Sequence, residues 1–297
     1  MPEKRVKLKL VREREAAGRT REIFDDLKRA LGVPGIPLLY QAYAALPEFL
    51  DMHWRAFKPL LATGHFWQLA DRLRGEAYTR THNYFQIGDL CEPLSQMSFS
   101  SGAKHQLEEV IELFNYKDAP VLLIASAQLL AFDQAIAKDE QSLAPPVEHP
   151  RFDEKPVLVD EEVATPMVKR TYEEIKRALG LPALNGDYKA FARWPDFLAE
   201  YWKALKPIVQ SAAYREQQRA LCESSETMAK DLAIRDVDFG FDALESNGFN
   251  GKQIEAIVRT TRILQNVFSG LVLNVAAAKI GFEGGTTKTA TDREFAA

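Results

Sequence analysis

The 297-residue sequence contains few of the residues on which metal and redox sites depend. Its two cysteines, Cys91 and Cys222, are far apart and form no CxxC pair, so neither disulfides nor zinc–thiolate sites are expected. The five histidines occur in no HxxxH or HExxH pattern, and we therefore predict no metal site. A formal net charge of −4 gives no reason to expect a nucleic acid or a membrane surface as partner.

Long hydrophobic runs and cofactor-binding motifs are also missing. The longest apolar runs, 119–132 and 270–282, are shorter than the ~20 residues of a membrane-spanning helix, so we interpret them as buried helices. No apolar stretch precedes a signal-peptide cleavage site, which together with the scarce cysteine favours a cytoplasmic protein. The absence of GxGxxG and GxSxG motifs argues against dinucleotide binding and serine-hydrolase chemistry, and no cofactor is expected.

What the sequence does contain is helical periodicity along most of its length. In residues 20–31 apolar side chains recur at three- and four-residue steps, and Gly32 and Pro34 then mark the end of a helix. No segment alternates with period two, so the predicted class is all-α. Further helices are predicted at 38–45, 48–61, 63–77, 102–115 and 119–137, with counterparts in the second half.

An internal repeat organises these helices. Residues 28–59 match 176–207 at a constant offset of 148 without a gap, and half of the positions are identical. This period is domain-sized, so we predict two tandem pseudo-symmetric helical repeats packed as an intramolecular pseudo-dimer. The predicted units are a first repeat at 1–137, a proline-rich acidic linker at 138–166, a second repeat at 167–283 and a flexible tail at 284–297.

Two polar residues stand out against this pattern. Asp187 occupies the position where the first repeat has Leu39, and Asn115 lies between two apolar helical stretches, where a turn is expected. Asp and Asn are also preferred capping residues next to helix ends. Both a capping role and a functional role are therefore open for each residue.

The segments LFNYKDAPVLLIASA and LGLPALNGDYKAFARWPDF resemble the group I 2-haloacid dehalogenases, and weaker similarity covers most of the chain. This family is similar in architecture to the alkylhydroperoxidase-like helical proteins, with two such repeats in one chain. The resemblance implies that Asp187 is the catalytic base and that Asn115 holds the attacking water. It also implies a homodimer.

The resemblance further implies hydrolysis of short 2-haloalkanoic acids to 2-hydroxy acids, with inversion and without a covalent ester intermediate. The turn residues are smaller than the aromatic side chains usual in the family, so we predict a roomier pocket for a longer 2-haloacid or another small carboxylate. Two alternatives remain: a relative acting on a different small acid, and a non-catalytic helical binding protein. The predicted substrate-binding residues are Gly35, Leu38, Asn185, Gly186 and Thr63.

Overall fold

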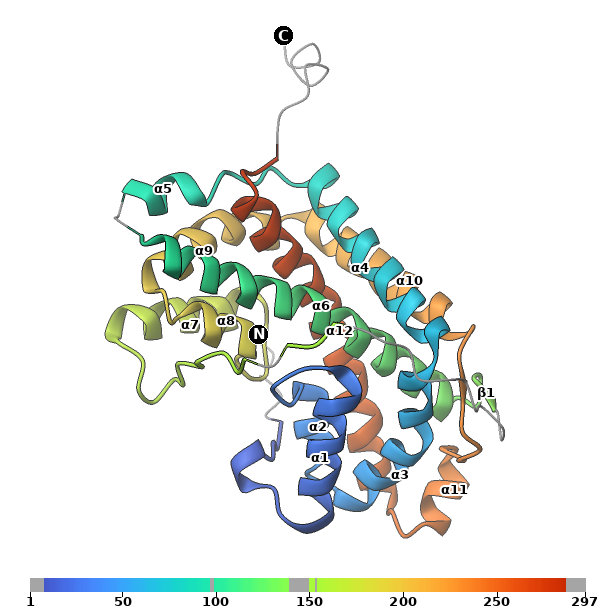
Figure 1. Ribbon diagram of the computed structural model, residues 1–297. Coiled ribbons are helices and arrows are strands. Elements are labelled where there is room, and N and C mark those ends of the chain that lie inside the picture. Colours follow the sequence, from blue (N-terminus) through green and yellow to red (C-terminus); the bar gives the residue numbers. More distant parts are fainter. Residues whose placement is uncertain (1–7, 97–98, 139–149, 153, 287–297) are drawn as a thin grey trace, which may run out of the picture.

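The computed structural model describes residues 8–96, 99–138, 150–152 and 154–286, and twelve α-helices make up almost all of its regular structure (Figure 1). The predicted all-α class is confirmed. The first six helices are α1 (Gly18–Leu31), α2 (Leu38–Tyr43), α3 (Pro47–Phe57), α4 (Gly64–Tyr84), α5 (Cys91–Gln96) and α6 (Ser101–Phe132). The next six are α7 (Pro166–Ala178), α8 (Gly186–Phe191), α9 (Pro195–Gln210), α10 (Ala212–Ala229), α11 (Phe241–Ser246) and α12 (Gly251–Phe282).

Short elements complete the described part of the chain. Two 3-10 helices, η1 (Glu13–Glu15) and η2 (Lys58–Ala62), precede α1 and follow α3. The strands β1 (Ala137–Lys138) and β2 (Ala233–Ile234) pair in parallel. No strand is predicted from the sequence, because a strand of two residues is too short to show an alternating pattern.

The centre of the molecule is formed by α6 and α12, which cross each other there (Figure 1), with α4 and α10 packed against both. The apolar runs that the sequence analysis interpreted as buried helices lie in these two central helices. By length and composition alone α12 could cross a membrane, but 83% of its most apolar window is buried inside the molecule. This burial is that of a core helix.

The prediction of two helices at 102–115 and 119–137 is wrong, because α6 continues without a break from Ser101 to Phe132. Pro120 lies inside this helix, where it removes one main-chain hydrogen bond at a cost of ~3 kcal/mol. Residues 119–127 are all buried, and the burial of this run offsets that cost. Asn115 therefore lies in the middle of a helix and caps neither end.

The helices follow in the same order in the two halves of the chain. The starts of α1 and α7 are 148 residues apart, and those of α6 and α12 are 150 apart. The glycines that end the first helix of each half, Gly32 and Gly180, have φ angles of 65° and 62°. This left-handed conformation is the one expected of a helix-ending glycine. The order supports the proposed tandem repeat.

The predicted linker extends to residue 166, but α7 already begins at Pro166, and the part after residue 149 is bound to both halves. The Phe152 N–H donates to the Gly32 carbonyl at 2.9 Å, and the Val159 N–H donates to the Lys189 carbonyl at 3.0 Å. We call residues 150–165 the connecting segment. Residues 139–149 of the predicted linker and 287–297 of the predicted tail lie outside the described residues.

Candidate functional site

A cavity of about 580 Å³ lies where the turn after α1 meets the turn after α7. The predicted substrate-binding residues Gly35, Leu38, Asn185 and Gly186 all line it, so the structure brings both turns to one pocket. Thr63 is not among the lining residues. Its hydroxyl instead caps α4 by accepting from the Phe66 N–H at 3.2 Å.

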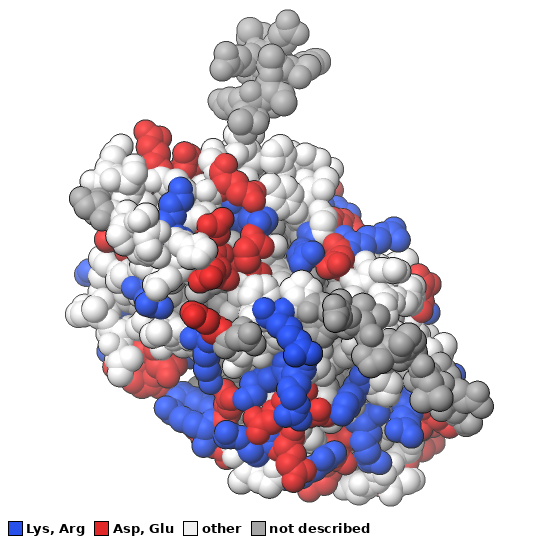
Figure 2. Space-filling model, in the orientation of Figure 1, with Lys and Arg blue, Asp and Glu red and all other residues white. Residues whose placement is uncertain are grey.

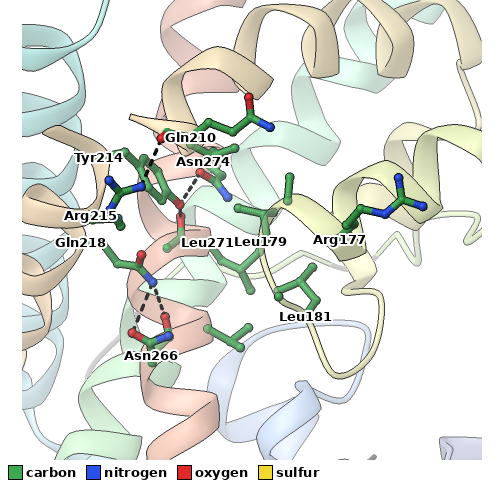
Figure 3. A pocket seen from close by; sticks show the side chains of 15 residues that line it. Arg177, Leu179, Leu181, Gln210, Tyr214, Arg215, Gln218, Asn266, Leu271 and Asn274 are labelled. Carbon is green, nitrogen blue, oxygen red and sulfur yellow. Dashed lines mark hydrogen bonds between the residues drawn. The ribbon is translucent and has the colours of Figure 1, made fainter. Parts of the chain in front are cut away.

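A second cavity, of about 460 Å³, lies between α7, α10 and α12 (Figure 3) and contains none of the predicted site residues. Its polar side chains mostly satisfy one another. Gln218 donates to the Asn266 carbonyl at 2.7 Å, and Tyr214 donates to Asn274 Oδ1 at 2.8 Å. The guanidinium of Arg177 points away from the other labelled residues in Figure 3. We therefore place the candidate site at the first cavity.

Asp187 is the second residue of α8 and is 1% exposed. The capping residue of this helix is Asn185, so Asp187 does not fill the capping role that the sequence analysis left open. Asn185 itself makes no side-chain capping bond, and its Oδ1 is buried without a hydrogen-bond partner among the described residues. Neither carboxylate oxygen of Asp187 accepts a hydrogen bond from a side chain of the described residues. Buried polar groups left without partners are rare and point to a functional site.

The pKa of Asp187 is raised to about 7. Burial is the largest cause, because an ionised carboxylate loses its hydration there, and the neighbouring carboxylate of Asp118 raises the pKa further. Lys117 and the main-chain N–H groups of Asp187 and Tyr188 oppose the shift. A carboxyl group with its pKa raised in this way suits a general base that works near neutral pH.

Asn115 lies on α6, which packs against α8, and is 9% exposed. The two helices touch next to it, since a Cβ added to Gly186 would lie 3.5 Å from the ring of Phe114. Asn115 follows Phe114 in the chain, and Asp187 follows Gly186. Neither Asn115 nor Asp187 lines the cavity itself, but each directly follows a lining residue, Phe114 or Gly186, at this helix–helix contact.

Sequence reasoning missed a second buried carboxyl group. Asp118 is 2% exposed and follows Asn115 by three residues on α6, which places both on one helix face. Lys117 Nζ lies 3.0 Å from Asp118 Oδ1 and 4.5 Å from the centre of the Phe114 ring. The sequence did contain a signal, because Asp118 is an acid inside the apolar segment LFNYKDAPVLL. A turn was expected in this segment, however, and an acid in a turn is normally exposed to solvent.

The cavity is lined by more cations than acids. The acids are Glu13, Asp160 and Glu161, and the cations are Arg12, Arg14, Arg21, Lys117, Lys155 and Lys189. Figure 2 shows Lys and Arg side chains concentrated, with acids among them, on the part of the surface where Figure 1 places α1. Five of the six cations are ion-paired: Arg12 with Glu162, Arg21 with Asp25, Lys117 with Asp118, Lys155 with Glu13 and Lys189 with Asp160. A small anion in the cavity would share these cations with their acids. Within the described residues no group of three or more His, Cys, Asp or Glu side chains could hold a metal ion.

Comparison with known proteins identifies the family of the chain. Residues 34–188 match the family described as "Halocarboxylic acid dehydrogenase DehI". The chain is 32% identical over 280 residues to an (R)-2-haloacid dehalogenase of Pseudomonas putida, covering 91% of each chain. It is 25% identical over 228 residues to a configuration-inverting 2-haloacid dehalogenase of Alcaligenes xylosoxydans xylosoxydans, covering 73% of this chain and 75% of the relative.

Among solved structures, a D-2-haloacid dehalogenase mutant in complex with D-2-CPA superposes with a TM-score of 0.85 at 27% identity, covering 93% of this chain and 96% of that one. The fold is thus that of a helical dehalogenase. The chain belongs to the DehI family of 2-haloacid dehalogenases, which are hydrolases acting on carbon–halogen bonds.

Proposed function

We propose that the protein hydrolyses (R)-2-haloalkanoic acids to (S)-2-hydroxy acids through a water molecule activated by Asp187. The observation that carries this proposal is the buried Asp187 carboxyl, which has no side-chain hydrogen-bond partner among the described residues and directly follows Gly186 of the cavity lining. The (R) preference comes from the relatives, since those from Pseudomonas putida and Rhizobium sp. strain NHG3 are both named (R)-2-haloacid dehalogenases. The solved complexes with D-2-CPA and with L-LA fit inversion at carbon.

In the proposed reaction, the oxygen of water forms a bond to the carbon that carries the halogen, while the carbon–halogen bond breaks and halide leaves. Asp187 takes one proton from the water as the new bond forms. A carboxylate with a pKa raised to about 7 is a much stronger base than an exposed aspartate, which favours this transfer. Because water attacks from the side opposite the halogen, the configuration inverts and no ester to the protein forms.

Asn115 is proposed to hold the water. Its amide offers a donor and an acceptor without charge, so it can orient water without competing for the proton. Asn185, whose Oδ1 is buried and has no partner among the described residues, borders the cavity and is a second group that can bind the water or the substrate. The cations of the lining favour the substrate carboxylate.

We propose that the pocket accepts 2-haloacids whose alkyl chain is longer than that of 2-chloropropionate. Gly35, Leu38 and Gly186 are small or flexible, and the cavity of about 580 Å³ falls within the range of pockets that hold much larger ligands. A homodimer, implied by the resemblance, belongs to the same proposal and can be tested by light scattering.

The test is halide release from (R)- and (S)-2-chloropropionate by wild type and by Asp187→Asn. Wild type is expected to release halide from the (R) acid and form (S)-lactate, and the variant to lose at least about 10³-fold in kcat. Asp196→Asn, on the exposed start of α9, is the matched control and should keep full activity. In a single turnover in H₂¹⁸O the label should enter lactate and not the protein. Activity in Asp187→Asn would exclude Asp187 as the base.

A further inference from the structure

Asp118 is a second ionisable group at the contact of α6 and α8, and the proposed reaction does not use it. It is 2% exposed, shares a helix face with Asn115, and has one oxygen, Oδ2, that lacks a hydrogen-bond partner among the described residues. A buried carboxyl normally carries hydrogen bonds or is replaced by an apolar residue. Its presence beside the proposed base therefore needs a reason.

Lys117 is the counter-ion of Asp118. Its Nζ lies 3.0 Å from Asp118 Oδ1 and over the ring of Phe114, and its side chain is only 14% exposed. A cation at this distance favours the ionised form of Asp118. Two carboxyl groups close together cannot both ionise easily, so the negative charge of Asp118 disfavours a second charge on Asp187.

Resting on the proposed function, we infer that Asp118, with Lys117 as its counter-ion, is a positioning residue that keeps a negative charge beside Asp187 and so makes Asp187 a stronger base. Burial raises the pKa of Asp118 as well, and Lys117 opposes that rise. Asp118 and Lys117 are the charged side chains with the largest effects on the pKa of Asp187.

The other groups around Asp187 do not replace this pair. The charge of Asp187 acts on the phenols of Tyr201 on α9 and Tyr188 on α8, and the Tyr201 hydroxyl donates to the Asn274 carbonyl at 2.7 Å. Burial raises the pKa of both phenols, so they stay neutral. On α8 itself, Lys189 is paired with Asp160 at 2.9 Å. The lysine at the far end of α12, Lys279, is paired with two glutamates, and Asn274 is the polar group of that helix that reaches Tyr188.

The experiment compares the pH profiles of kcat/KM for wild type, Asp118→Asn and Lys117→Gln. In Asp118→Asn the negative charge is gone, so the acid limb of the profile should shift to lower pH by at least about one unit. The value of kcat/KM at high pH should fall several-fold, because Asp187 is then a weaker base. Removing the cation should move the limb in the opposite direction. General loss of stability would not produce shifts of opposite sign.

Two control variants on the same helix change the same charges away from the site. Asp133→Asn is exposed at the end of α6, and Lys104→Gln removes an exposed lysine that lies 5.5 Å from the centre of the Phe282 ring. Both should leave the pH profile unchanged. An acid limb that stays in place in Asp118→Asn, with kcat alone reduced, would overturn the inference and leave a purely structural role.

A second measurement separates this inference from the proposed function. The ¹³C NMR titration of the Asp187 carboxyl, in full-length protein without substrate, should show its midpoint falling in Asp118→Asn and rising in Lys117→Gln. If wild type released no halide from any 2-haloacid, the proposed function would fail while the titration still decided the coupling. If wild type is active and the titration midpoint of Asp187 is the same in wild type and in both variants, Asp118 and Asp187 are not coupled, and only the proposed function stands.

Discussion

Ionised Asp187 should lower the free energy of unfolding at the pH at which the enzyme works. Replacing Asp187 by a residue that does not ionise should remove this destabilisation. The pKa of this carboxyl is about 7 in the folded protein against 3.8 for the ordinary group, so the folded state binds its proton more tightly than the unfolded state. The penalty is absent below pH 4, grows as the pH rises through this window, and is complete above pH 7. The contribution of Asp187 to the stability of wild type is therefore most favourable at low pH.

The magnitude follows from the size of the shift. A change from 3.8 to about 7 corresponds to ~4 kcal/mol once the group is fully ionised, at 1.36 kcal/mol per pKa unit. Asp187→Asn does not ionise. The free energy of unfolding of this variant minus that of wild type should therefore be larger at pH 8 than at pH 4, by up to ~4 kcal/mol. The constant effect of placing an amide at this position cancels in that comparison.

Urea unfolding at pH 4, 5, 6, 7 and 8 measures the difference directly. Asp196→Asn removes an exposed carboxyl from the start of α9 and should follow wild type at every pH. Parallel curves for wild type and Asp187→Asn would refute the reasoning, because they would mean that Asp187 titrates alike in the folded and unfolded protein. An inactive variant that is more stable than wild type near pH 8 is the expected pattern for a strained catalytic group.

Three further outcomes are expected. Raising ionic strength from 20 to 500 mM should increase KM for 2-chloropropionate several-fold with little change in kcat, because salt screens the cavity's cations; an unchanged KM would exclude that attraction. Leu38→Trp should narrow the cavity and lower kcat/KM for 2-bromohexanoate at least about tenfold more than for 2-chloropropionate, whereas equal losses would place the alkyl chain elsewhere. Thr63→Ala should cost ~1 kcal/mol of stability through the lost helix cap and leave kcat/KM unchanged, like Ser211→Ala at the cap of α10; a selective loss of activity would put Thr63 in the site.

Much of the fold could be predicted from the sequence because local signals and packing agree there. The apolar stripe of α1 and the left-handed Gly32 that ends it are encoded within a few residues, and the same holds around Gly180. The prediction failed at Pro120, where local propensity favours a break and burial of the following apolar run overrides it. Propensity is measured on exposed helices, and α6 lies in the core.

The same error hid Asp118. Gly35, Leu38, Asn185 and Gly186 were found because they lie in matching turns of the proposed repeat. Asp118 was missed because a residue assigned to a turn is expected to be solvated, while its place on the buried face of α6 follows only from the helix being continuous. The basic residues of the cavity come partly from the connecting segment, whose sequence has no periodicity that could reveal what it packs against.

The connecting segment also bears on how this protein could change its substrate. Lys155, Pro156 and Leu158 form one wall of the cavity, yet they belong to no helix, and their replacement disturbs no central helix pair. If the proposed repeat arose by joining two copies of one half, the separate copies would have had no such wall. In that case the joining segment would have added residues to the cavity wall as well as linking the halves. Substitutions in this segment could then change the shape of the cavity without changing the packing of the helices.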